Sequence, residues 1–120
     1  MDGEISAAEL KELLDADADV RIVDIRSPPA FRRGHIPNSE NIPFQELTGR
    51  IEEFVDADRV VTACPHGKAS VQAARLIDSY EGFSGRVDSL ETGIDEWPHA
   101  LEAEESVAEA GGDEGPDAPF

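Results

Sequence analysis

Apolar residues recur along this chain at two spacings, one typical of helices and the other of buried strands. Apolar positions three and four residues apart predict helices over about 7–14, 47–55 and 73–80. The run Ser6-Ala7-Ala8-Glu9 has the spacing of a capping box and marks the start of the first helix. A single helical turn is predicted at 28–33, where two prolines lead and Gly34 follows.

Short segments typical of strands lie between these helical segments. The runs at 21–25, 59–63 and 86–90 predict buried strands, and Asn41-Ile42-Pro43 predicts a brief one. Strands and helices therefore alternate over distances typical of parallel strand–helix–strand units. We expect an α/β fold with a parallel sheet covered on both faces.

Length and charge exclude several classes of protein. The chain has 120 residues, which suits one domain, and its formal net charge is -17. That charge argues against nucleic-acid or anionic-membrane partners and favours a monomer at low salt. The single cysteine excludes an internal disulfide framework and favours a reducing, cytoplasmic setting. The first residues lack the features of a secretory signal, and three widely spaced histidines form no metal-binding motif.

The acidic residues are concentrated at the end of the chain. Residues 102–120 contain seven acidic side chains and no basic one, so we expect a domain over 1–101 and a disordered acidic tail over 102–120. The domain is also acidic, and Lys11 and Lys68 are its two lysines. An acid-rich, lysine-poor surface favours a halophilic source, and the alternative is an ordinary acidic domain whose tail binds a partner.

Cys64 stands where an α/β sheet binds ligands, between the strand 59–63 and a helix that begins near Ala69. The loop between them contains Gly67 and can turn its backbone N–H groups inward, while the helix dipole adds positive potential. A thiol there has a lowered pKa and is a nucleophile beside an anion site, with positive charge from His66 and Lys68. The alternative is a buried structural cysteine.

Three motifs resemble those of the rhodanese-like sulfurtransferases. The first is the loop Cys64-Pro65-His66-Gly67-Lys68-Ala69-Ser70. The second runs from Ile22-Val23-Asp24-Ile25-Arg26 through Phe31 to Gly34-His35-Ile36-Pro37-Asn38 and Asn41-Ile42-Pro43. The third is Thr92-Gly93 with Trp97. The resemblance covers about residues 4–101. It implies a three-layer domain with a central, mainly parallel five-stranded sheet flanked by helices.

The resemblance also implies a reaction. Cys64 is the expected catalytic residue, which takes the outer sulfur of thiosulfate or of a persulfide donor and passes it to a thiol or protein acceptor. Residues 65–70, named above, are expected to bind the anionic donor, without a cofactor or a metal. Pro65 has no N–H and Lys68 is the loop's one basic residue where many relatives carry arginine, so an organic persulfide remains an alternative donor.

Four further residues are expected to support the site. Asp24 and Arg26 suit an ion pair at a strand end, and His35 suits a structural hydrogen bond in a turn. Trp97 is interpreted as a core anchor, and a place at the mouth of the pocket is the alternative. Ser70 is interpreted as a residue that starts or caps the helix and hydrogen-bonds the loop backbone. Catalytic roles for Asp24, Arg26 and His35 are the alternatives.

Two other functions remain open. A rhodanese-like binding module without activity is one, although such modules typically lose the cysteine. A phosphatase or arsenate reductase is the other, but these relatives carry arginine six residues after the cysteine, where this chain has Ser70.

Overall fold

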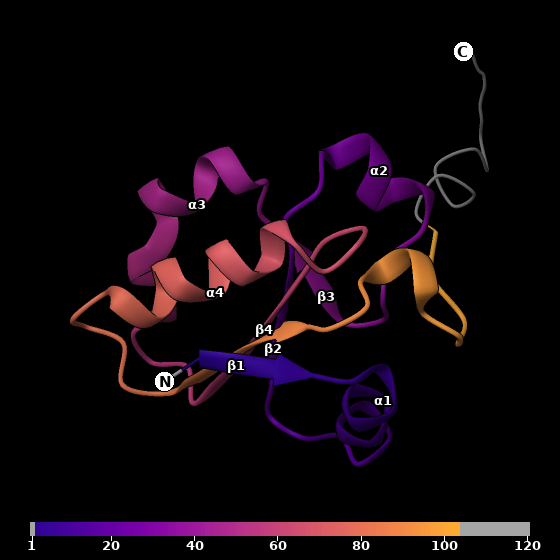
Figure 1. The fold of residues 1–120 in the computed structure, drawn as a ribbon, viewed down its shortest axis with the longest axis horizontal. Helices are drawn as coiled ribbons and strands as arrows, with labels where there is room; N and C mark the ends of the chain where they lie inside the picture. The colour runs from indigo at the N-terminus through magenta and orange to yellow at the C-terminus, as the bar shows by residue number, and fades with distance from the viewer. Residues whose placement is uncertain (1, 104–120) are drawn as a thin grey trace.

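Strands and helices alternate along the domain, as the apolar pattern predicts. The computed structural model describes residues 2–103, drawn in colour in Figure 1. The strands are β1 (Asp2–Ile5), β2 (Arg21–Asp24), β3 (Ser39–Asn41), β4 (Arg59–Ala63) and β5 (Arg86–Leu90). The α-helices are α1 (Ala7–Asp15), α2 (Pro28–Arg33), α3 (Phe44–Arg50) and α4 (Ala69–Ser79). Two 3₁₀ turns, η1 (Ile51–Phe54) and η2 (Ile94–Glu96), complete the described elements.

The five strands form one parallel sheet in the order β1-β5-β4-β2-β3. The predicted parallel α/β architecture is confirmed. Strand β4 lies in the middle of the sheet, where Val61 pairs with Ile22 of β2 on one side and with Asp88 of β5 on the other. The residue that follows β4 therefore emerges at the centre of the carboxyl edge.

Each face of the sheet is covered by helices, so the domain has three layers. Figure 1 shows α3 and α4 on one side of the sheet and α1 on the other. Because successive strand residues point to opposite faces, Val60 packs under α4 while Val61 packs toward α1. Both side chains are fully buried, and burial of such a side chain stabilises the fold by about 1.5–3 kcal/mol. The rigid sheet provides the platform for the loops at its carboxyl edge.

The first helix begins at the predicted capping box. The hydroxyl of Ser6 accepts a hydrogen bond from the Glu9 N–H at 3.1 Å, and the Glu9 carboxylate accepts one from the Ser6 N–H at 3.0 Å. These hydrogen bonds to Ser6 lower the pKa of the Glu9 carboxyl. Within residues 2–103, none of the helices combines the length and the apolar character that a membrane crossing requires.

Several predicted boundaries are wrong. Strand β1 escapes the apolar pattern because it is an edge strand in which Ile5 is the buried hydrophobic residue. The helix predicted over 47–55 is α3 followed by the 3₁₀ turn η1, and both place apolar residues on the core side. The brief strand is Ser39–Asn41 rather than 41–43, because Pro43 already forms the N-cap of α3. Residues 104–120 of the predicted tail lie outside the described part of the chain.

Candidate active site

The loop after β4 leads from the carboxyl edge of the sheet into α4 (Figure 1). Cys64 is the first residue of this loop, directly after the last residue of β4. Its side chain is 2 % exposed. Cys64 lies beneath a loop of four residues, Pro65 to Lys68, and α4 begins at Ala69. The sulfur is therefore held next to a helix N-terminus, which stabilises negative charge.

Hydrogen-bonding groups from the loop and from α4 surround the Cys64 sulfur. The backbone N–H groups of Gly67 and Ser70 donate to Sγ at 3.1 and 3.3 Å. The Ser70 hydroxyl lies 3.4 Å from Sγ, where it accepts from a thiol and can donate to a thiolate. The inward N–H groups anticipated for this loop are present, and they make a pocket suited to a negatively charged sulfur.

Gly67 allows the loop to curl around the sulfur. Its φ is +81°, in the left-handed region that favours glycine. A Cβ at this position would lie 2.3 Å from the carbonyl oxygen of Glu91. Glycine is therefore required both for the backbone turn and for the close approach of the loop to the segment after β5.

Two opposing effects set the acidity of Cys64. Burial raises the pKa of the thiol, because it penalises the charged form. The hydrogen bonds from the Ser70 hydroxyl and from the backbone N–H groups of Ser70, His66 and Gly67 lower it. Together they outweigh burial, so the pKa of Cys64 lies below its ordinary value. A lower pKa increases the thiolate fraction near neutral pH, and the thiolate is the nucleophile.

A chain of buried hydroxyls continues behind the sulfur. Ser70 Oγ lies 2.6 Å from Ser89 Oγ on β5, and the Thr62 hydroxyl of β4 donates to the Ser70 carbonyl at 2.7 Å. All three residues are fully buried. Ser70 lies in the first turn of α4, which agrees with one of its two predicted roles, but it does not cap the helix. Lys68 occupies the N-cap position, and the Ser70 hydroxyl turns inward to Cys64 and Ser89.

Thr62 and Ser89 are two residues of the site that the sequence motifs do not include. They pair with each other across β4 and β5, and both side chains face the α4 layer. Their signal in the sequence is a hydroxyl residue inside each of two predicted strands. Thr62 has apolar neighbours on both sides in β4, whereas Ser89 follows the second polar residue, Asp88, in β5. A buried hydroxyl needs a partner, so such positions point to a polar network.

The turn η2 supports the loop from the outside. The Ile94 N–H donates to the Cys64 carbonyl at 2.8 Å, and the Asp95 N–H donates to the Pro65 carbonyl at 3.1 Å. Gly93 precedes the turn with φ +84°, and a Cβ there would lie 2.3 Å from the Pro65 carbonyl oxygen. The third motif thus holds the backbone of the cysteine loop in place.

The mouth of the loop carries little positive charge. Lys68 and His66 are both exposed, and His66 Nδ1 lies 3.7 Å from a carboxylate oxygen of Asp95. Lys68 is the permanently charged basic residue of the segment 64–70. The segment therefore combines one permanent positive charge with backbone N–H groups that point to the sulfur.

Asp24 and Arg26 form the expected ion pair at the end of β2. Two Arg26 nitrogens contact the Asp24 carboxylate at 2.7–3.1 Å, and Asp24 is 1 % exposed. Arg26 also donates to the Gly34 carbonyl at 2.6 Å. The pair therefore orders the corner of α2, and the Ile25 N–H ties this corner to Ala63, next to Cys64, at 3.0 Å.

His35 belongs to the same corner rather than to the sulfur pocket. Its Nδ1–H donates to the Phe31 carbonyl at 2.8 Å, and its ring stacks on Phe31 with centroids 3.9 Å apart. Its backbone forms an antiparallel bridge with Glu102, a residue of the predicted tail. These contacts fit the structural role that the turn suggests.

Trp97 lies in the layer between the sheet and α1, where it packs in the cluster that contains Leu10 and Ile36. It is 8 % exposed, and its ring meets the His99 ring edge-on at 5.1 Å. Cys64 belongs to the cluster on the other face of the sheet. The core-anchor interpretation of Trp97 agrees with this position.

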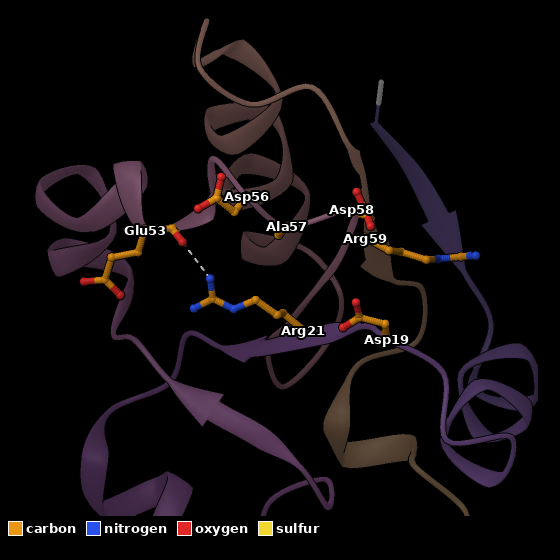
Figure 2. Close-up of a pocket in the computed structure, with 7 residues that line it drawn as sticks. All are labelled: Asp19, Arg21, Glu53, Asp56, Ala57, Asp58 and Arg59. Atoms are coloured by element: carbon orange, nitrogen blue, oxygen red, sulfur yellow. Dashed lines mark hydrogen bonds between the residues drawn. The ribbon is translucent and has the colours of Figure 1, made fainter.

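A polar hollow at the other edge of the sheet is separate from the cysteine loop (Figure 2). Arg21 and Arg59 are the first residues of β2 and β4, and Cys64 follows the last residue of β4. In Figure 2 the Arg21 side chain reaches across the hollow to the Glu53 carbonyl, at 2.7 Å. Arg21 also donates two hydrogen bonds to the Glu40 carboxylate, so its guanidinium is already hydrogen-bonded within the fold.

Comparison with known proteins gives one family. The family model described as the rhodanese-like domain matches residues 6–100. The thiosulfate sulfurtransferase GlpE of Pseudoalteromonas translucida is 35 % identical over 96 residues, which cover 80 % of this chain and 89 % of that protein. YrkF of Bacillus subtilis is 31 % identical over 94 residues, 78 % of this chain, but the match spans only 50 % of YrkF.

Solved structures give the same result. The human single-domain sulfurtransferase TSTD1 is 28 % identical, with a TM-score of 0.68, and the match covers 78 % of this chain and 93 % of that one. The structural match with TSTD1 therefore covers most of the described domain.

Proposed function

The chain belongs to the rhodanese-like domain family, and we propose that it is a sulfurtransferase that carries a sulfane sulfur as a persulfide on Cys64. The observation that carries this proposal is the set of donors around one buried sulfur: two backbone N–H groups and the Ser70 hydroxyl. Relatives named thiosulfate sulfurtransferase and sulfurtransferase support the reaction class.

In the first half-reaction, the Cys64 thiolate attacks the outer sulfur of the donor. With thiosulfate, a new S–S bond forms on Cys64, the S–S bond of thiosulfate breaks, and sulfite leaves with the electron pair. The outer sulfur of the persulfide keeps a negative charge. The N–H groups of the loop and the N-terminus of α4 are suited to stabilise that charge as it develops.

In the second half-reaction, an acceptor thiolate attacks the outer sulfur of the persulfide. The acceptor becomes a persulfide, the S–S bond on Cys64 breaks, and Cys64 returns as a thiolate. No cofactor is needed, because both steps exchange one S–S bond for another. A small thiol or a cysteine of a protein partner suits this acceptor role, and a reducing compartment such as the cytoplasm keeps the thiols available.

The residue six positions after the cysteine favours sulfur transfer over phosphoryl transfer. Phosphatase-like relatives need an arginine there, whose two parallel N–H groups bind a tetrahedral oxyanion. In this chain the position is Ser70, and its hydroxyl faces Cys64 Sγ at 3.4 Å. One hydroxyl can hydrogen-bond a single sulfur atom, but it does not replace the two parallel N–H groups that bind a phosphoryl group.

Mass spectrometry of the intact protein tests the proposal. The folded protein is incubated in molar salt with thiosulfate and, separately, with an organic persulfide. We expect a gain of one sulfur atom in the wild type and none in Cys64→Ser. No sulfur uptake from either donor, by a sample with a native circular dichroism spectrum, would contradict the proposal. Release of phosphate from an aryl phosphate would favour the phosphatase alternative instead.

A further inference from the structure

Asp95 lies beside the cysteine loop, although no motif in the sequence singles it out. The docking of η2 holds its backbone: the Asp95 N–H donates to the Pro65 carbonyl at 3.1 Å, and Ile94 donates to the Cys64 carbonyl at 2.8 Å. Its carboxylate lies 3.7 Å from His66 Nδ1. The backbone N–H of His66 is one of the groups that lower the pKa of Cys64. The Asp95 carboxylate therefore contacts a residue of the loop that covers Cys64.

The carboxylate changes the charge that an incoming donor meets. Lys68 supplies one permanent positive charge to the segment 64–70. The Asp95 carboxylate places one negative charge beside His66 of the same segment. The Asp95 side chain is 55 % exposed, so its field reaches the solvent in front of the loop. A donor with two negative charges loses more from this field than a donor with one, because Coulomb energy scales with the product of the charges.

We infer that Asp95 is a specificity-determining residue that disfavours the thiosulfate dianion relative to sulfur donors of lower negative charge. The inference rests on the proposed function, since it concerns the donor for the Cys64 persulfide. The Asp95 carboxylate thus shifts the preference of this loop from thiosulfate toward a less anionic persulfide or thiosulfonate. The backbone N–H groups around Cys64 are a separate part of the site, and the inference leaves their role unchanged.

Two donors that differ by one charge test this inference. Thiosulfate is a dianion and methanethiosulfonate is a monoanion. Both give their outer sulfur to a thiolate, with sulfite or methanesulfinate as the leaving group. The measured quantity is the second-order rate constant of persulfide formation for each donor, in about 0.1 M salt and again in molar salt. The ratio of the two constants reports charge discrimination.

Asp95→Asn removes the charge and keeps the backbone N–H to Pro65. For a carboxylate on the order of 8 Å from the donor, the thiosulfate constant should rise about two- to sixfold at about 0.1 M salt. The logarithm of the change for methanethiosulfonate should be about half as large. Asp95→Lys should raise both rate constants further. Molar salt should bring the ratio of each variant's rate constant to that of the wild type close to one.

Glu81→Gln is the matched control, because it changes the net charge by the same amount as Asp95→Asn. Glu81 lies beyond the C-terminal end of α4, far from the cysteine loop. The 11-residue helix places it about 16 Å along the helix axis from the cysteine loop. It should leave the donor ratio unchanged. The circular dichroism spectrum and melting temperature of each variant verify the fold, and Asp95→Ser provides a second neutral variant.

An unchanged donor ratio in Asp95→Asn and Asp95→Ser would overturn the inference, as would an equal change in Glu81→Gln. Either result would leave the proposed function intact if the wild type still gains sulfur on Cys64. Absence of sulfur uptake from both donors in every folded variant would instead contradict the proposed function itself.

Discussion

The hydroxyl oxygens of Ser70 and Ser89 lie 2.6 Å apart, and this contact links the sulfur pocket to strand β5. When Cys64 is a thiolate, the Ser70 hydroxyl can donate to Sγ and accept from Ser89. When Cys64 is a thiol, the direction of both hydrogen bonds can reverse. Because both serines are fully buried, water does not replace either partner.

Removal of the Ser89 hydroxyl should raise the pKa of Cys64. Ser89→Ala leaves Ser70 without its donor, so the hydrogen bond from Ser70 to the thiolate loses support. We expect the rate of alkylation by iodoacetamide near neutral pH to fall about two- to fivefold, because less of the cysteine is thiolate. Ser70→Ala removes the direct contact and should lower the rate further. The pH dependence of alkylation measures both effects.

Ser89→Thr keeps the hydroxyl and provides the control. Its alkylation profile should match the wild type, and the far-UV circular dichroism spectrum of all three variants should be unchanged. An alkylation profile of Ser89→Ala that superimposes on the wild type would show that Ser89 has no part in setting the acidity of Cys64.

The stability of the domain should depend on pH through Cys64. The pKa of this thiol is lower in the folded state than in the unfolded chain, despite the opposing effect of burial. The thiolate therefore stabilises the fold fully above the unfolded-state pKa, and this stabilisation is lost as the pH falls through the folded-state pKa. Each tenfold difference in thiol acidity between the two states corresponds to about 1.4 kcal/mol of stability.

Denaturant unfolding of the wild type and of Cys64→Ser, at a series of pH values, measures this contribution. The difference between the two free energies of unfolding should change in favour of the wild type as the pH rises from below the folded-state pKa. A difference that stays constant across the series, or that changes against the wild type at high pH, would contradict the lowered pKa.

A methyl group at Gly67 should damage both the fold and the site. Gly67→Ala forces an L-residue to φ +81° and brings its Cβ to 2.3 Å from the Glu91 carbonyl oxygen. We expect a loss of about 1–3 kcal/mol in the free energy of unfolding, together with slower sulfur uptake. Thermal and urea unfolding measure the first effect, and intact mass measures the second.

Gly49→Ala is the contrasting substitution. Gly49 lies in α3, and a Cβ there has no heavy atom within 4 Å. Because alanine favours helix more than glycine does, this variant should gain up to about 1 kcal/mol and take up sulfur normally. Equal effects of the two substitutions would show that the tight approach at Gly67 does not matter.

The buried ion pair at the end of β2 should be important for stability. Asp24→Asn leaves the Arg26 guanidinium, 12 % exposed, without its carboxylate. We expect a loss on the order of 3 kcal/mol in urea unfolding, because an unpaired charge is left partly buried. Arg50→Met, which breaks the exposed pair with Glu53, should leave the unfolding midpoint almost unchanged. Similar midpoints for the two variants would argue against a structural role for the buried pair.

The sequence predicts the centre of this fold better than its edges. Strands β2 and β4 lie inside the sheet and are covered on both faces, so their apolar runs stand out from the polar turns. Strand β1 lies at an edge, and Ile5 alone gives it an apolar signal. Strand β3 has no fully buried residue and is shifted by two positions from its predicted place.

The same contrast applies to the site. The cysteine, its glycine and the following helix are consecutive in the chain, so local physics predicts an anion-binding loop. Ser89 and Asp95 reach that loop only because β5 pairs with β4 and η2 docks on the Cys64 carbonyl. Contacts between such distant segments leave no spacing pattern in a single sequence. The inward orientation of the Ser70 hydroxyl escapes prediction for the same reason, because Ser70 lies in α4 and its partner Ser89 lies on β5.

Following one sulfur atom on and off the protein by intact mass tests persulfide transfer through Cys64 most directly. The wild type is loaded with a sulfur donor, separated from it, and then mixed with an acceptor thiol. We expect a gain of one sulfur atom, mapped to Cys64 after proteolysis, and a return to the original mass as the acceptor gains that sulfur. Sulfur uptake that persists in Cys64→Ser, or that never occurs in the folded wild type, would show that Cys64 is not the sulfur carrier.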